Sequence, residues 1–104
     1  MAGRIEGRIA IVTGAARGIG LAIASRFARE GAGVLICDID ADVLDEVAAP
    51  LRAEGRDILV CRCDVADEAS IAAMIEATVR RWGRIDILVN NAAISDDTPI
   101  DDLT

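Results

Sequence analysis

The sequence alternates between two hydrophobic periods, and this alternation constrains the fold more than any other feature. Short apolar runs are separated by stretches in which apolar residues recur every three to four positions. The first pattern is typical of strands buried on both faces, and the second of amphipathic helices. The expected strands are residues 9–12, 34–37, 58–61 and 85–89. Because the connections are short and crossovers are right-handed, the order β-α-β-α-β-α-β predicts an α/β fold, a parallel sheet covered by helices on both faces.

Polar residues and glycines mark the expected helix ends. Asp40 and Asp67 can each cap the helix that follows, and Gly31 and Gly83 are expected to end helices. Pro50 would remove a backbone hydrogen bond at a cost of ~3 kcal/mol, so we expect a kink or an early end there. The expected apolar stripes are Ile19, Ala22, Ile23 and Phe27; Leu44, Val47, Ala48 and Leu51; and Ile71, Met74, Ile75, Thr78, Val79 and Trp82.

Length and charge limit the class of protein. The 104 residues suffice for one compact domain, and 53% hydrophobic residues with a net charge of −7 indicate a soluble globular chain. The acidic balance argues against nucleic acid as a partner, since little positive charge is available to neutralise phosphates. No apolar run is long enough to span a membrane, and no signal-peptide core follows the N-terminus. A cytoplasmic protein without a membrane partner is therefore expected.

The three cysteines, Cys37, Cys61 and Cys63, stand in apolar surroundings. An odd number of such residues is typical of reduced thiols in a core. The alternative is that Cys61 and Cys63 form half of a metal site. The chain has no His and only one further Cys, so the sequence favours core thiols and predicts no metal ligands.

The segment TGAARGIG, residues 13–20, places Gly14, Gly18 and Gly20 directly after the first expected strand. The N-terminus of the following helix offers free N–H groups and the positive end of its dipole, which together favour an anion. Gly14 would permit the tight turn, Gly18 would let a pyrophosphate approach the backbone, and Gly20 would let helix and strand pack closely. The alternative is a plain strand-to-helix turn.

Asp38 ends the second expected strand, about 20 residues after the glycine segment. A carboxylate there can hold the ribose hydroxyls of NAD, or it can simply cap the next turn. It would also repel the 2′-phosphate of NADP, by ~4 kcal/mol for charges 4 Å apart at an effective dielectric near 20. Arg17 opposes this preference because it could reach that phosphate. The sequence predicts NAD, with NADP less favoured.

Polar residues also end the third and fourth expected strands. Asp64 and Val65 stand where an adenine could accept a backbone N–H and donate to a carboxylate, although a simple turn before the next helix would look the same. Asn90 and Asn91 follow an apolar strand, so their amides need hydrogen bonds. They are either clamps at the strand end or ligand contacts.

Together, T-G-x-x-x-G-x-G, Asp38, Asp64-Val65 and ILVNNAA resemble the short-chain dehydrogenase/reductase family, from about Gly7 to the end of the chain. The resemblance implies a Rossmann-type doubly wound sheet, of which this chain holds the first portion. It also implies hydride transfer between NAD(H) and a carbonyl or secondary alcohol, and a homo-oligomer for the full-length protein. The implied NAD contacts are Gly14, Arg17, Gly18, Ile19, Gly20, Asp38, Asp64, Val65 and Asn91. Ala93 departs from the family pattern, which has Gly there.

The catalytic residues of that family are a Tyr, a Lys, a Ser and a further Asn, all beyond the fourth strand. This chain contains no Tyr, no Lys and no His. We therefore expect no catalytic residue in it: residues 1–104 form an NAD-binding portion, truncated before the catalytic half, that binds the cofactor without turning it over. Residues 98–104 look like the start of another helix, and residues 87–89 would form an exposed sheet edge. The alternatives are a stand-alone, non-catalytic nucleotide-binding module and a remnant that binds nothing.

Overall fold

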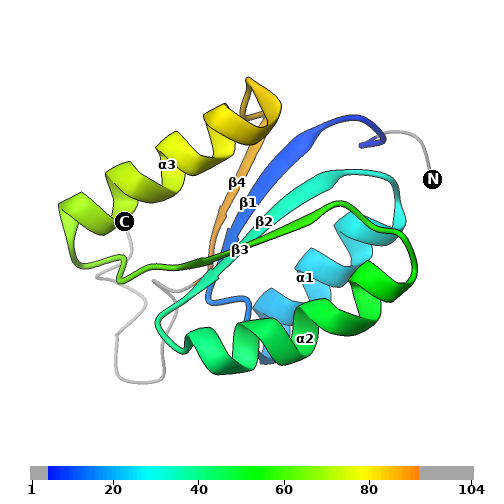
Figure 1. Ribbon diagram of the computed structural model, residues 1–104, viewed down its shortest axis with the longest axis horizontal. Coiled ribbons are helices and arrows are strands. Elements are labelled where there is room, and N and C mark those ends of the chain that lie inside the picture. Colours follow the sequence, from blue (N-terminus) through cyan, green and yellow to red (C-terminus); the bar gives the residue numbers. More distant parts are fainter. Residues whose placement is uncertain (1–4, 92–104) are drawn as a thin grey trace, which may run out of the picture.

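The computed structural model describes residues 5–91, which form a parallel sheet flanked by helices (Figure 1). In chain order the elements are β1 (Ile9–Thr13), α1 (Gly18–Arg29), β2 (Gly33–Asp38), α2 (Ala41–Ala53), β3 (Ile58–Arg62), α3 (Glu68–Trp82) and β4 (Ile87–Asn90). The strand order is β3-β2-β1-β4, and every neighbouring pair is parallel. The predicted α/β fold and the predicted order of elements are confirmed.

Helices α1 and α2 lie on one side of the sheet and α3 lies on the other (Figure 1). Alternate residues of a strand face opposite sides of the sheet. Because helices cover both sides, both faces of the central strands are buried. Val12, Val34 and Ile36 pack beneath α1 and α2. Ile11 and Leu35 pack beneath α3. This two-sided burial explains why the strands read as continuous apolar runs.

The order in which strands are added to the sheet reverses at β1, although all strands remain parallel. Strands β2 and β3 extend to one side of β1, and β4 then pairs with its other side: Ile11 faces Leu35 in β2 and Leu88 in β4. In open α/β sheets, ligands bind beyond the carboxyl ends of the strands at this point of reversal. The fold therefore directs attention to the residues that follow β1 and its neighbours.

The predicted helix ends are largely confirmed. Asp40 accepts a hydrogen bond from the backbone N–H of Val43 at 3.4 Å and caps α2. Asp67 accepts from Ala69 N–H at 3.2 Å and caps α3, which ends at Gly83 in the left-handed conformation. The early end considered at Pro50 is wrong, since α2 continues to Ala53. Pro50 lies in the last turn, where its carbonyl still accepts from Glu54 N–H at 3.1 Å.

The apolar stripe predicted for α1 is partly wrong. The buried face consists of Gly20, Ala24 and Ala28, and Ile19 is 69% exposed. The close approach of Gly20 to β1 orients the helix, and Ile19 then lies about 100° around the helix from that contact. Small residues on the buried face allow this approach, while Ile23 and Phe27 (on the flank of the helix) are partly buried.

The stripe predicted for α3 is wider than the face that is buried. Met74 and Thr78 are buried, and Thr78 satisfies its hydroxyl by donating to Met74 O at 2.8 Å. Ile75 and Val79 remain 43% and 46% exposed. Leu88 on β4 is 62% exposed, which agrees with the exposed sheet edge predicted there. No helix in the described part of the chain is long and apolar enough to cross a bilayer.

Candidate functional site

The loop between β1 and α1 is tied to the end of β2 through its backbone. Ala15 N–H donates to Cys37 O at 3.1 Å, and Ala16 N–H donates to Asp38 Oδ2, also at 3.1 Å. Both alanines are buried. Gly14 has a φ of 63°, a left-handed conformation that favours glycine, as the predicted tight turn requires. Hydrogen bonds to the end of β2 thus fix the position of residues 14–17, which we call the glycine loop.

Gly18 opens α1 with an exposed backbone. Its φ is also 63°, and a Cβ added there would meet no atom within 4 Å. The preceding residue, Arg17, is the N-cap of α1 but makes no side-chain capping hydrogen bond. Within residues 5–91, the first N–H groups of α1 therefore lack an N-cap acceptor of the kind that Asp40 and Asp67 provide for α2 and α3. This arrangement suits a bound anion.

Gly20 shows why helix and strand can approach so closely. A Cβ there would stand 2.1 Å from Gly14 O and 2.8 Å from Asn91 Nδ2. Asn91 Nδ2 donates to Gly14 O at 3.3 Å. The Gly14 carbonyl is therefore enclosed between α1 and the residue that follows β4. The packing predicted for Gly20 is present, and Asn91 acts as a clamp on the glycine loop.

Asp38 lies where the loops after β1 and β2 meet. Its Oδ2 accepts from Ala16 N–H at 3.1 Å, and its Oδ1 accepts from Asp40 N–H at 3.2 Å. The capping alternative considered for Asp38 is thus part of its role. A carboxylate offers about four lone-pair sites, so both oxygens can still accept bonds from ligand hydroxyls. The backbone bonds fix the direction in which the carboxylate points.

A pocket of about 160 Å³ lies at this end of the sheet. Its lining residues are Gly14, Cys37, Asp38, Ile39, Cys63, Asp64 and Val65. The structure therefore brings together the predicted Gly14, Asp38, Asp64 and Val65, which lie at or just after the carboxyl ends of three different strands. Asp64 Oδ1 also accepts from Ala66 N–H at 2.9 Å, so it forms the turn before α3 that was its alternative interpretation.

The remaining predicted residues lie around this pocket rather than in its wall. Arg17 and Ile19 project from the start of α1, and Arg17 forms an ion pair with Asp40 at 3.3 Å. Asn90 Oδ1 accepts from the Thr13 hydroxyl at 3.0 Å, which makes it a strand-end clamp. Ala93, the departure from the family pattern, lies outside the described residues.

Sequence reasoning missed Ile39 and the thiols of the pocket wall as site residues. Cys37 and Cys63 are buried side by side, with Cys37 Sγ 3.9 Å from Cys63 O. Burial raises the pKa of the Cys37 thiol, aided by the neighbouring Cys63, so the sulfur stays protonated and neutral. All three cysteines are free, and Cys37 and Cys63 lie in the core as predicted, whereas Cys61 is only partly buried. Within residues 5–91 no group of three His, Cys, Asp or Glu side chains is placed to hold a metal ion.

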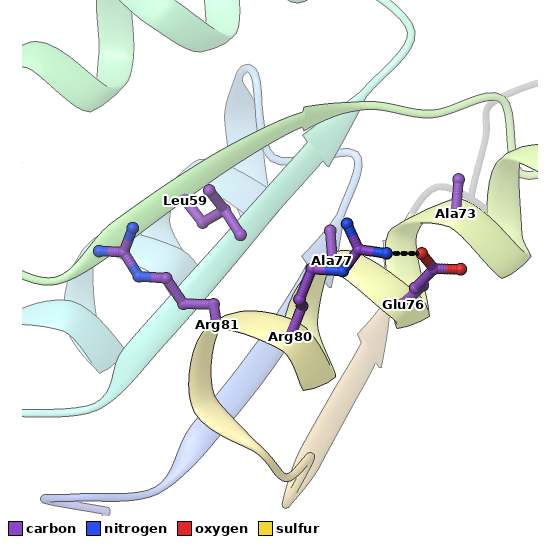
Figure 2. Close-up of a pocket in the computed structure, with 6 residues that line it drawn as sticks. All are labelled: Leu59, Ala73, Glu76, Ala77, Arg80 and Arg81. Atoms are coloured by element: carbon purple, nitrogen blue, oxygen red, sulfur yellow. Dashed lines mark hydrogen bonds and ion pairs between the residues drawn. The ribbon is translucent and has the colours of Figure 1, made fainter.

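A larger groove of about 510 Å³ lies elsewhere, between α3 and β3 (Figure 2). Ala73, Ala77 and Leu59 line it together with Glu76, Arg80 and Arg81. Arg80 is paired with Glu76, as Figure 2 shows, and Arg81 pairs with Asp57 at 2.5 Å. Its charged groups therefore already have partners, and it contains none of the predicted site residues. The pocket at the carboxyl ends of the strands is the better candidate.

Comparison with known proteins identifies the family. Residues 8–104 match the family model described as short chain dehydrogenase. The chain therefore belongs to the short chain dehydrogenase family of oxidoreductases, as its motifs predicted. A Rossmann-type fold follows from the same comparison, since the sheet and helices match solved structures of this family.

Individual relatives are similar over nearly the whole chain. The 7alpha-hydroxysteroid dehydrogenase of Escherichia coli is 40% identical over 98 residues, covering 94% of this chain, and the galactitol 2-dehydrogenase of Agrobacterium fabrum is 46% identical over 101 residues, covering 97%. This chain spans 38% of the length of each relative. A short chain dehydrogenase/reductase from Burkholderia phymatum, solved in complex with NAD, is 31% identical with a TM-score of 0.79, and the match covers 81% of this chain and 30% of that one.

Proposed function

We propose that residues 1–104 form the NAD-binding portion of an oxidoreductase that transfers a hydride between NAD(H) and a carbonyl or secondary-alcohol substrate. The observation that carries the proposal is the open backbone at Gly18. Its left-handed conformation, the free space above it and the start of α1 beneath it together form a cradle for a pyrophosphate. A pyrophosphate can approach the backbone of Gly18 only because no Cβ occupies the space.

The remaining parts of the cofactor fit the residues around the cradle. The Asp38 carboxylate is held by backbone N–H groups and can accept from ribose hydroxyls, and the pocket beside it continues to Asp64 and Val65, where an adenine would lie. Gly20 and Asn91 hold the loop in place. The proposed cofactor-binding residues are Gly14, Arg17, Gly18, Ile19, Gly20, Asp38, Asp64, Val65 and Asn91.

We also propose that the Asp38 carboxylate makes the protein prefer NAD over NADP. Asp38 cannot turn away from the ribose site easily, because Ala16 N–H and Asp40 N–H each hold one of its oxygens. A 2′-phosphate would therefore meet a fixed negative charge. The NAD bound to the structural relative from Burkholderia phymatum supports the same choice of cofactor class.

Catalysis is proposed to require residues beyond these 104. A nicotinamide cofactor supplies the hydride donor or acceptor, but the reaction also needs a group that exchanges a proton with the substrate oxygen. This chain has no Tyr, Lys or His to do so. We therefore propose that the 104 residues alone bind NAD(H) without turnover. The same absence is the observation that favours a stand-alone nucleotide-binding module as the second candidate.

The test compares two glycines that share a conformation but not a location. Gly18 and Gly55 both have positive φ, and a Cβ at either would meet nothing within 4 Å. Gly55 follows α2, away from the cradle. Gly18→Val and Gly55→Val should therefore carry a similar backbone strain, and only Gly18→Val should fill the pyrophosphate site.

Binding of NADH to the 104-residue protein is measured by the change in NADH fluorescence. We expect Gly18→Val to weaken binding at least about tenfold (~1.4 kcal/mol) and Gly55→Val to leave the dissociation constant within about twofold of the wild type. Unchanged affinity in Gly18→Val would mean that the loop is only a turn. Thermal unfolding of each variant confirms that the folded proteins are being compared.

A further inference from the structure

Arg17 is a cation at the end of the glycine loop, and the structure holds it in an ion pair. Its Nη2 lies 3.3 Å from Asp40 Oδ2. Arg17 stands at the end of the glycine loop and Asp40 at the start of α2, so the pair joins the loop after β1 to the loop after β2. Asp38, which lies between these loops, bonds to both through Ala16 N–H and Asp40 N–H.

The Asp40 carboxylate is oriented by hydrogen bonding so that it can hold the Arg17 guanidinium. One carboxylate oxygen, Oδ1, accepts from Val43 N–H and caps α2, while the other, Oδ2, faces Arg17. Its own N–H donates to Asp38 Oδ1 at 3.2 Å. The carboxylate therefore keeps its orientation whether or not Arg17 is present, whereas the long Arg17 side chain can leave by rotation about its own bonds.

We propose that Asp40 is a specificity-determining residue that acts through Arg17. By holding the guanidinium, Asp40 lowers the affinity of the protein for cofactors that carry a 2′-phosphate, because such a phosphate must displace Asp40 as the partner of Arg17. The proposal rests on the proposed nucleotide function. It assigns discrimination against NADP to two carboxylates: Asp38 repels the phosphate directly, and Asp40 removes the cation that would attract it.

The expected effect is modest because the pair is exposed. The Arg17 and Asp40 side chains are 69% and 42% accessible to solvent, and exposed ion pairs contribute little. Releasing Arg17 and removing one negative charge beside the phosphate should together tighten NADPH binding by about threefold to tenfold. NADH has no 2′-phosphate, so its affinity should stay within about twofold.

The variant that isolates the ion pair is Asp40→Asn. Asn is as good an N-cap as Asp, so the hydrogen bond to Val43 N–H is kept and the stability of α2 should not change. Asp42→Asn is the matched control, since it removes the same charge from the first turn of α2 at an exposed position. The partner residue is tested with Arg17→Ala, alone and combined with Asp40→Asn.

Dissociation constants for NADH and NADPH are measured by fluorescence for the wild type and these four variants at low salt, with thermal unfolding as the check on folding. We expect Asp40→Asn to tighten NADPH binding, Asp42→Asn to leave it nearly unchanged, and the gain from Asp40→Asn to be clearly smaller in the Arg17→Ala background, where only the loss of the negative charge remains. An equal gain with and without Arg17 would overturn the role of the ion pair, as would unchanged NADPH affinity in Asp40→Asn. Absence of NADH binding to the wild type would instead overturn the proposed nucleotide function.

Discussion

Replacing Gly20 by Ala should destabilise the protein, although Ala is the better helix former. In an open helix the change would stabilise by about 1 kcal/mol. Here the new Cβ would stand 2.1 Å from the Gly14 backbone oxygen, against an ordinary contact of 3.4–4 Å, and 2.8 Å from Asn91 Nδ2. A backbone oxygen cannot rotate away as a flexible side chain can. The helix must therefore move away from the end of β1.

The magnitude follows from the contacts that this movement disturbs. Overpacking a tight interior site costs about 1–3 kcal/mol, and losing the hydrogen bond from Asn91 to Gly14 costs about 1 kcal/mol more. The gain in helix propensity offsets about 1 kcal/mol of this. We therefore expect a net loss of about 1–3 kcal/mol, which in a domain of this size lowers Tm by ~4–8 °C for each kcal/mol.

Urea unfolding followed by the fluorescence of Trp82, the single tryptophan, measures this loss. Ala22→Gly, at an exposed position of the same helix, supplies the scale of helix propensity alone and should cost about 1 kcal/mol. If Gly20→Ala proves as stable as the wild type, or more so, the close packing of α1 on the glycine loop is refuted.

The remaining predictions concern the cofactor and acid stability. Asp38→Ala should weaken NADH binding and relax discrimination against NADPH, and an unchanged ratio of the two dissociation constants would remove Asp38 from the ribose site. Hydrogen bonding by the Arg84 guanidinium, with a further bond from Ile9 N–H at 2.8 Å, holds the pKa of Asp86 below its usual value. A lowered native pKa stabilises the fold above the unfolded value of about 4, and this contribution is lost as pH falls through the native pKa. The unfolding free energy of Asp86→Asn should therefore fall less steeply than that of the wild type below about pH 4, and identical slopes would contradict this role for Asp86.

Local patterns were sufficient to predict the elements and most of their ends. Buried strands show as apolar runs, and Asp40 and Asp67 cap their helices through short-range geometry that the sequence displays directly. The orientation of α1 is different. It depends on the contact between Gly20 and Gly14 O, which joins two elements through a backbone atom. Ile19 was therefore assigned to the wrong face, because periodicity alone favours the larger apolar side chain.

The candidate site was predictable only where side chains carry the signal. The glycines and Asp38 stand out by residue type and spacing, whereas the N–H groups of Ala15 and Ala16 that brace the loop could belong to any residue. The ion pair of Arg17 with Asp40 likewise depends on how two loops meet in space. Its two members are separated in the sequence by α1 and β2, and no local pattern connects them.

The dependence of the site on backbone groups also indicates where substrate choice must reside. Backbone N–H groups, glycine conformations and the Gly14 carbonyl shape the cradle, and the side chains of Asp38 and Asn91 bond to this backbone. The relatives named for a hydroxysteroid and for galactitol both share at least 40% of their residues with this chain over this region. If both relatives hold a cofactor in a cradle of the kind that we propose for this chain, other parts of each protein must recognise the compound for which it is named. We therefore expect exchange of residues 5–91 between such relatives to change cofactor affinity and leave substrate preference in place.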